Sequence, residues 1–210
     1  MKLTVLGATG GVGRQVVLQA LKDGDQVTAV VRDPARLPIA DHPALDVVRG
    51  DVMDPATLAP LLVGRDAVIS ALGHRGRGPT TVCADGARSL VAAAAQVGVR
   101  RVLVVSASGA FIEENDDLVT RRLVKPLLGV VLRESFADTT TMEAVIRASG
   151  LDWTIVRPPR LTDGPHTGRY RTGHHGVRRG YTVARADVAD CLLSLVDRSE
   201  SVGRTITVAR

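Results

Sequence analysis

Short apolar runs alternate along the first half of the chain with longer segments in which apolar residues recur at helical spacing. This alternation is typical of strands and helices that follow one another in a parallel sheet. Strands are predicted over residues 2–6, 26–31, 45–49, 67–72 and 101–107. Helices are predicted over 12–22 and 82–97, and another is expected to start with Asp54 as N-cap and Pro55 as first residue. Right-handed crossovers then predict a Rossmann-type, doubly wound α/β sheet with strand order 3-2-1-4-5.

The second half of the chain is less regular. Helices are predicted over 136–148 and 185–196, and strands over 152–157 and 205–209. Residues 111–135 are expected to form a mobile loop with solvated carboxylates, then a helix broken at Pro126 and Gly129. Residues 158–182 are rich in Gly, Arg, Pro and His and are expected to be irregular. We interpret both segments as cleft-side insertions in a single domain over residues 1–210.

The composition indicates a globular protein with an aliphatic core, because 45% of the residues are hydrophobic and only 2% are aromatic. The net charge of +5 comes mainly from scattered arginines without a nucleic-acid-binding motif. We therefore expect an anionic small molecule as partner, and no nucleic acid. Cys83 and Cys191 lack CxxC or metal-ligand spacing and are expected to be reduced and buried. The sequence shows no signal peptide and no apolar run long enough to span a membrane, so the chain is expected to be cytoplasmic and without a membrane partner. It is expected to be a monomer or a small homo-oligomer.

A glycine-rich turn between the first predicted strand and helix carries the strongest chemical signal. A diphosphate needs backbone N–H donors at close range, which side chains would obstruct, and a helix N-terminus adds favourable partial charge. The order strand, turn and helix is the one that dinucleotide binding requires. The turn residues predicted to hold the pyrophosphate are Gly7, Thr9, Gly10, Gly11, Val12 and Gly13.

The end of the second predicted strand distinguishes the two nicotinamide cofactors. An NAD site usually places a carboxylate there to bind the ribose hydroxyls. Arg32 occupies that position here and is suited to the 2′-phosphate of NADP, with Arg36 assisting. Asp33 leaves an NAD interpretation open. We expect NADP(H) to be preferred over NAD(H).

Two further segments are predicted to bind the adenosine part of the cofactor. Asp51 and Val52 follow the third strand, where a carboxylate suits the adenine amino group and an apolar side chain covers the ring. A turn-capping role is the alternative for Asp51. Small residues at the end of the fourth strand permit close approach, and the segment there is Ala71, Leu72 and Gly73.

These motifs, taken together, resemble the atypical short-chain dehydrogenase/reductase family. The resemblance also includes Ser106 to Gly109, Ser149 to Pro159, and Ala184 to Asp190, so it covers nearly the whole chain. It is nearest to the NAD(P)H-binding, NmrA-like group that includes the biliverdin/flavin reductases. The main-line family uses a Tyr-x-x-x-Lys pair for acid/base chemistry. Here Tyr170 and Tyr181 are followed four residues later by His174 and Arg185, which argues against the standard carbonyl mechanism.

The biliverdin/flavin reductases also lack this pair, so the resemblance implies a proton from solvent or from a hydroxyl near the nicotinamide. By position, Ser106 and Ser108 are the candidate hydroxyls, and Arg160 would offer a cation to an acidic acceptor. Ser106 and Pro158 also count as cofactor-binding candidates. The alternatives are turn hydrogen bonding for the serines and simple surface exposure for Arg160.

These observations predict an NADPH-dependent oxidoreductase that passes hydride to a flat conjugated acceptor such as a flavin, quinone or tetrapyrrole. The alternative is a non-catalytic NADP(H) sensor that changes its protein partner with cofactor state. An isomerase or lyase would need a base that the sequence does not identify. No metal site is expected, because His166, His174 and His175 lie in a glycine-rich segment without further ligands.

Overall fold

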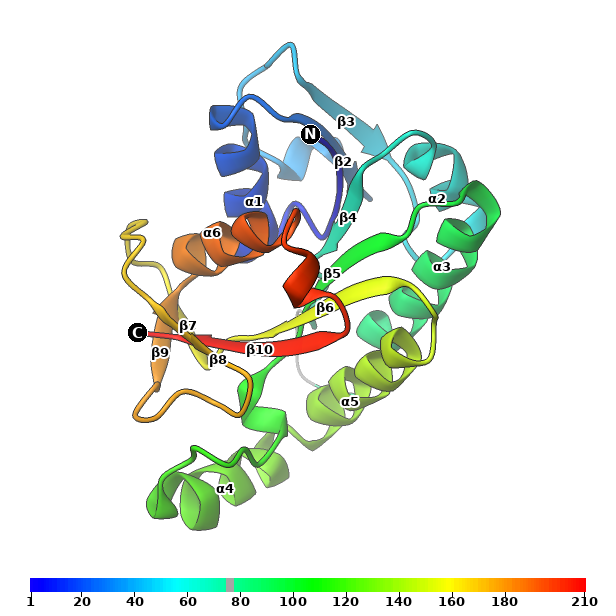
Figure 1. Cartoon of the computed structure of the whole chain (residues 1–210). Coiled ribbons are helices and arrows are strands. Elements are labelled where there is room, and N and C mark those ends of the chain that lie inside the picture. Colours follow the sequence, from blue (N-terminus) through cyan, green and yellow to red (C-terminus); the bar gives the residue numbers. More distant parts are fainter. Residues whose placement is uncertain (75–77) are drawn as a thin grey trace.

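The computed structural model describes residues 1–74 and 78–210. One eight-stranded sheet has the order β3-β2-β1-β4-β5-β6-β10-β8 (Figure 1), and β8 alone in it runs antiparallel to its neighbour. The strands are β1 Lys2–Leu6, β2 Gln26–Val31, β3 Leu45–Arg49, β4 Ala67–Ser70, β5 Arg101–Val105, β6 Asp152–Arg157, β8 Arg171–Gly173 and β10 Arg204–Ala209. The predicted fold class and the order of the first five strands are therefore confirmed.

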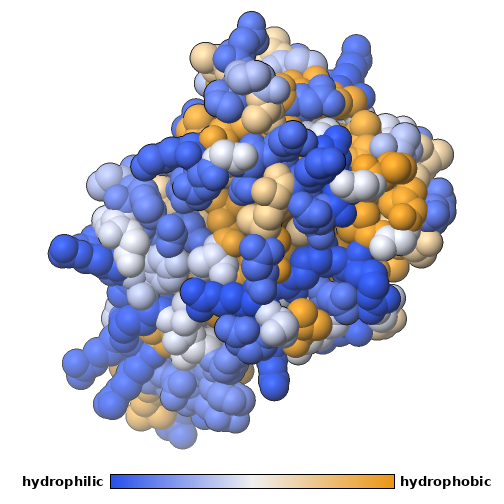
Figure 2. Space-filling view, turned by 45° about the horizontal axis from the view of Figure 1, so that its top comes forward, coloured by the Kyte–Doolittle hydropathy of each residue, from blue (hydrophilic) through white to orange (hydrophobic). Residues whose placement is uncertain are grey.

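Helices cover both faces of the sheet (Figure 1). α1 (Gly11–Lys22) and α6 (Arg185–Leu195) pack together on one face, and α2 (Pro55–Leu62), α3 (Val82–Val97) and α5 (Arg133–Arg147) lie on the other. Each layer buries its own aliphatic cluster against the strands. Within the described part of the chain, no helix combines the length and the apolar character needed to cross a membrane. Figure 2 shows hydrophilic residues over much of one face, with hydrophobic residues gathered at its centre and towards its right edge.

Local sequence signals explain several helix ends. Asp54 begins α2 as predicted, because its side chain accepts a hydrogen bond from the Ala56 amide at 3.0 Å and Pro55 follows as the first helical residue. Gly98 ends α3 in the left-handed conformation, with φ at 78°. The predicted helix over 136–148 begins three residues earlier, at Arg133.

β4 and β5 are each two residues shorter than predicted, because they end at Ser70 and Val105. The residues that follow them leave the sheet at its carboxyl edge and line a cavity. The apolar pattern therefore continues past the end of each strand into residues that have a different role.

The segment 158–182 is more ordered than expected. It contains β7 (Arg160–Thr162), which pairs in parallel with β9 (Thr182–Ala184), and it also contributes β8 to the main sheet. Asp187, buried in the first turn of α6, accepts hydrogen bonds from the amides of Thr167 and Gly168 at 2.7 and 3.0 Å. Backbone pairing and one buried carboxylate thus order a segment whose composition predicted irregular structure.

The prediction for residues 111–135 was wrong in two respects. Glu113 is buried and Asp116 is half-buried. Lys125 donates to Asp116 at 2.6 Å and Arg157 pairs with Glu113, so these two carboxylates are paired and not solvated, whereas Glu114 is exposed as expected. The chain is also helical without a break at Pro126 or Gly129, from a π-helical turn over Thr120–Val124 into α4 (Lys125–Val131). Pro126 lies where the π-helical turn passes into α4, and the interruption comes instead at Leu132.

A buried carboxylate of α5 caps the neighbouring helix α3. The two oxygens of Asp138 accept hydrogen bonds from the amides of Cys83 and Ala84 at 2.9 and 2.8 Å. Asp138→Ala is expected to lower the free energy of unfolding by about 2 kcal/mol, since it removes the cap and leaves two buried amides unpaired. Urea denaturation measures this change. Glu134→Ala on the exposed side of α5 is the control, and an equal loss in both variants would contradict the assignment.

Candidate functional site

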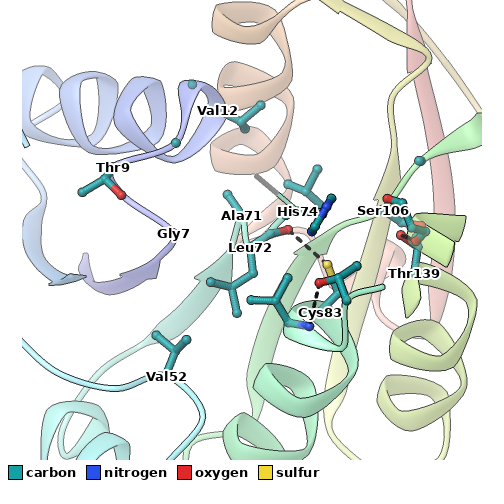
Figure 3. Close-up of a pocket in the computed structure, with 18 of the residues that line it drawn as sticks. Gly7, Thr9, Val12, Val52, Ala71, Leu72, His74, Cys83, Ser106 and Thr139 are labelled. Atoms are coloured by element: carbon teal, nitrogen blue, oxygen red, sulfur yellow. Dashed lines mark hydrogen bonds between the residues drawn. The ribbon is translucent and has the colours of Figure 1, made fainter. Parts of the chain in front are cut away.

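A cavity of about 650 Å³ opens at the carboxyl edge of the sheet, beside β1 where the strand order reverses. In an open α/β sheet this is the position at which ligands bind. Figure 3 shows the glycine turn on one side of the cavity, Ser106 and Thr139 on the other, and Leu72, His74 and Cys83 between them. The predicted residues that line it are Gly7, Thr9, Gly10, Gly11, Val12, Arg32, Asp51, Val52, Ala71, Leu72, Gly73 and Ser106.

The glycine turn is shaped by close backbone contacts. Gly7 has a positive φ of 77°, and a Cβ there would lie 2.5 Å from the carbonyl oxygen of Ala71. A Cβ at Gly13 would collide with the carbonyl oxygen of Gly7. Gly13 therefore lets α1 pack on the turn and, contrary to the prediction, does not itself line the cavity. Within the described residues, no side chain caps the first amides of α1, so these donors are left for a ligand.

The arginines after β2 differ in position. Arg32 lines the cavity, whereas Arg36 lies in an exposed 3₁₀ turn (Pro34–Arg36) away from it. Asp33 is outside the lining and caps that turn by accepting a hydrogen bond from the Ala35 amide at 3.1 Å. Asp51 lines the cavity and also accepts from the Met53 amide at 2.9 Å, so it combines the two roles considered for it.

Of the candidate catalytic residues, only Ser106 lines the cavity. Ser108 is buried, and its amide donates to the carbonyl oxygen of Pro158. Neither of these two residues lines the cavity. Arg160 is exposed on β7 while its neighbour Leu161 lines the cavity, because alternate residues of a strand point to opposite sides. The structure therefore does not bring Ser108, Pro158, Arg160 and Arg36 into the cavity lining with Ser106, and their predicted roles stay predictions.

A buried ionic network lies directly behind Ser106. The Ser106 hydroxyl donates to Glu143 Oε1 at 2.5 Å, and Glu143 is only 2% exposed. Arg157 binds both oxygens of Glu143, at 2.8 and 2.6 Å, and reaches Glu113 at 3.2 Å. Burial alone would lower the pKa of Arg157, but hydrogen bonds and charge from Glu143 and then Glu113 outweigh it and raise that pKa.

Thr139 and Glu143 stand on α5 at i and i+4 spacing, which is the spacing of the Tyr-x-x-x-Lys pair. Thr139 lines the cavity, and its hydroxyl donates to the carbonyl oxygen of Ser135 at 2.9 Å. The two tyrosines lie elsewhere, since Tyr170 donates to Asp190 and Tyr181 donates to Asp117. The described cavity wall therefore offers hydroxyls, with a buried carboxylate behind Ser106, and no phenol.

Sequence reasoning did not assign His74, Cys83 or Arg185 to the site, although all three line the cavity. Burial, and then Asp138, raises the pKa of the Cys83 thiol to about 12, so it stays protonated at neutral pH. The Nε2 atom of His74 is inaccessible and has no hydrogen-bond partner in the described part of the chain. A signal for His74 existed, because it follows the end of a predicted strand at the carboxyl edge.

The cavity fits a dinucleotide. The first amides of α1, which no side chain of the described residues caps, are polar groups that a bound ligand would satisfy. Across residues 1–74 and 78–210, no group of three His, Cys, Asp or Glu side chains could hold a metal ion. The fold and the cavity define a Rossmann-type dinucleotide-binding protein.

The chain belongs to the NAD(P)H-binding family, whose model matches residues 7–199. Proteins named as an oxidoreductase and as an epimerase are among those to which it is similar. An uncharacterized chloroplast protein of Arabidopsis thaliana is 31% identical over 99% of this chain and 76% of its own length. An uncharacterized sugar epimerase of Bacillus subtilis is 28% identical over 97% of this chain and 92% of its own length.

Solved structures agree on the fold. The Lactococcus lactis oxidoreductase YlbE is 25% identical, with a TM-score of 0.82 over 100% of this chain and 91% of that one. A Veillonella parvula short-chain dehydrogenase/reductase in complex with NADP is 21% identical, with a TM-score of 0.83 over 100% and 94% of the two chains. The second likeness shows the fold alone.

The glycine contacts give a stability test. Gly13→Ala is expected to lower the free energy of unfolding by about 1–3 kcal/mol, because the new Cβ meets backbone that cannot move aside cheaply. The matched control is Gly129→Ala in α4, where a Cβ meets nothing within 4 Å and helix propensity predicts up to about 1 kcal/mol of stabilisation. Urea titration of both variants measures the difference. Equal stability of the two would contradict the packing role of Gly13.

Proposed function

We propose that this protein is an NADPH-dependent reductase that passes hydride to a conjugated acceptor. The observation that carries the proposal is the hydrogen bond made by Ser106, the candidate catalytic hydroxyl that lines the cavity. The Ser106 hydroxyl donates a hydrogen bond to Oε1 of the Glu143 carboxylate, which also forms an ion pair with Arg157. A hydroxyl bound to a carboxylate is a weak proton donor, and no tyrosine lines the cavity to replace it.

A weak donor suits an acceptor that needs little proton help. When bound, NADPH supplies the hydride. The reduced form of a conjugated acceptor spreads its negative charge over several atoms, so water or Ser106 is a sufficient proton source. The protein then contributes mainly by stacking and orienting the acceptor in a cavity with apolar walls such as Val12, Leu72 and Leu161.

A relative of known activity supports this acceptor class. A Streptomyces griseus reductase of (4-alkanoyl-5-oxo-2,5-dihydrofuran-3-yl)methyl phosphate is 35% identical over 156 residues, which are 74% of this chain and 46% of that protein. The name of its substrate describes an unsaturated ring that carries carbonyl groups. The present chain shares less than half of the length of that reductase, so its own acceptor is proposed by chemical class only.

The preference for NADPH is proposed from Arg32 and Asp33. Arg32 lines the cavity after β2, while the competing carboxylate of Asp33 caps a turn outside it. Arg32→Ala is therefore expected to weaken NADPH binding by about 1–3 kcal/mol and to leave NADH binding nearly unchanged. Fluorescence titration with both cofactors measures the two dissociation constants. Arg36→Ala is the control, and equal weakening of NADPH and NADH by Arg32→Ala would contradict the assignment.

The acceptor class is tested by NADPH consumption, followed by absorbance. We expect turnover with members of a panel of FMN, riboflavin, quinones and biliverdin, and none with isolated ketones or aldehydes, which need a stronger acid. Gly10→Asp, which places a carboxylate in the diphosphate turn, is the blank. No turnover in a protein that binds NADPH would contradict a reductase and support a cofactor-sensing role.

A further inference from the structure

The side chain of Arg185, the first residue of α6, lies across the glycine turn. A Cβ added to Gly11 would collide with Cδ of Arg185 and would lie 2.6 Å from its Nε. Both residues line the same cavity. The missing side chain at Gly11 therefore makes room for Arg185, in addition to any room that it leaves for a ligand.

This arrangement places two positive groups side by side. The N-terminus of α1 carries partial positive charge, and its first turn contains no acidic residue. The guanidinium of Arg185 comes to the same turn, and its partner is Asp163, to which Nη1 donates at 2.6 Å. The Asp163 side chain is 90% exposed, and exposed ion pairs bind weakly in water.

An anion between the helix N-terminus and the guanidinium would satisfy both positive groups. A diphosphate carries two charges and several acceptor oxygens, and it matches the fork of an arginine better than a single carboxylate does. We propose that Arg185 is a diphosphate clamp, which exchanges Asp163 for the pyrophosphate of the bound dinucleotide. The inference rests on the proposed cofactor site and does not depend on turnover.

The clamp comes from the C-terminal part of the chain. β9 ends at Ala184, directly before Arg185, and pairs with β7, which brings Leu161 to the same cavity. α6 packs on α1, and Gln19 of α1 donates to the carbonyl oxygen of Ala186 at 2.9 Å. Arg185 is thus held over the turn by backbone pairing and helix packing, and only its guanidinium needs to change partner.

Arg185→Met, which keeps the length of the side chain without its charge, tests the clamp. The probes are NADPH, NADH, and two fragments that compete with NADPH in a fluorescence titration. ADP-ribose contains the diphosphate, whereas adenosine 2′-monophosphate lacks it. We expect NADPH, NADH and ADP-ribose each to bind roughly tenfold more weakly, the scale of one charge-assisted hydrogen bond, and adenosine 2′-monophosphate to bind as before.

Three further variants sharpen the result. Arg169→Met removes the same charge from an exposed position outside the cavity and is expected to change no affinity. Asp163→Asn removes the competing carboxylate and is expected to tighten ADP-ribose binding. Arg32→Ala is expected to give the opposite fragment pattern, with weaker adenosine 2′-monophosphate and unchanged ADP-ribose. Thermal unfolding of each variant verifies that the fold is kept.

Unchanged affinity of folded Arg185→Met for ADP-ribose would overturn the clamp. Equal weakening by Arg185→Met and Arg169→Met would also overturn it, because general surface charge would then explain the effect. If the variants show the expected changes in affinity but the protein reduces no acceptor, the clamp is supported and the proposed reductase activity is contradicted. Binding and turnover thus test the two proposals separately.

Discussion

The cavity depends on a close approach between two pieces of backbone. The β1–α1 turn can lie against the end of β4 because Gly7 has no Cβ to strike the carbonyl oxygen of Ala71. The same turn can lie against α1 because Gly13 has no Cβ to strike Gly7. These contacts direct the first amides of α1 towards the cavity, and they set its width on the side of the dinucleotide. A side chain at Gly7 would push the turn away from the end of β4, and one at Gly13 would push α1 away from the turn.

A second constraint is the buried network behind Ser106. Glu143 lies on α5, Arg157 ends β6, and Glu113 comes from the loop after β5, so three segments are tied through charged groups. Buried ions are costly to desolvate, and this cost is offset only when each charge has good partners. Glu143 has them, since Ser106, Arg147 and Arg157 all donate to it. The network thereby fixes the hydroxyl of Ser106 and gives it a carboxylate neighbour in place of a Tyr-Lys pair.

Membership in the NAD(P)H-binding family leaves the chemistry open, because its relatives include proteins named as reductases and as an epimerase. A Rossmann domain supplies the dinucleotide site, while the reaction is set by the groups near the nicotinamide. In this chain the cavity wall carries the hydroxyls of Ser106 and Thr139, which are weak acids, and the segment that completes the cavity comes from the C-terminal part. Leu161 and Arg185 connect that segment to the cofactor side.

The sequence alone determined the fold class, the order of the first five strands, the glycine turn and the positions of Arg32 and Asp51, because each depends on local patterns. The spacing of hydrophobic residues, the turn residues and the helix caps each involve only a few neighbouring residues, so they can be recognised in the sequence itself. Tertiary structure decided that Ser108 and Arg160 lie outside the cavity lining, that Glu113 is buried, and that Arg185 covers Gly11. The burial of Glu113 and the placement of Arg185 depend on contacts between residues far apart in the sequence, namely Glu113 with Thr207, 94 positions apart, and Gly11 with Arg185. Such contacts arise only when helices and strands pack, and no local pattern specifies them.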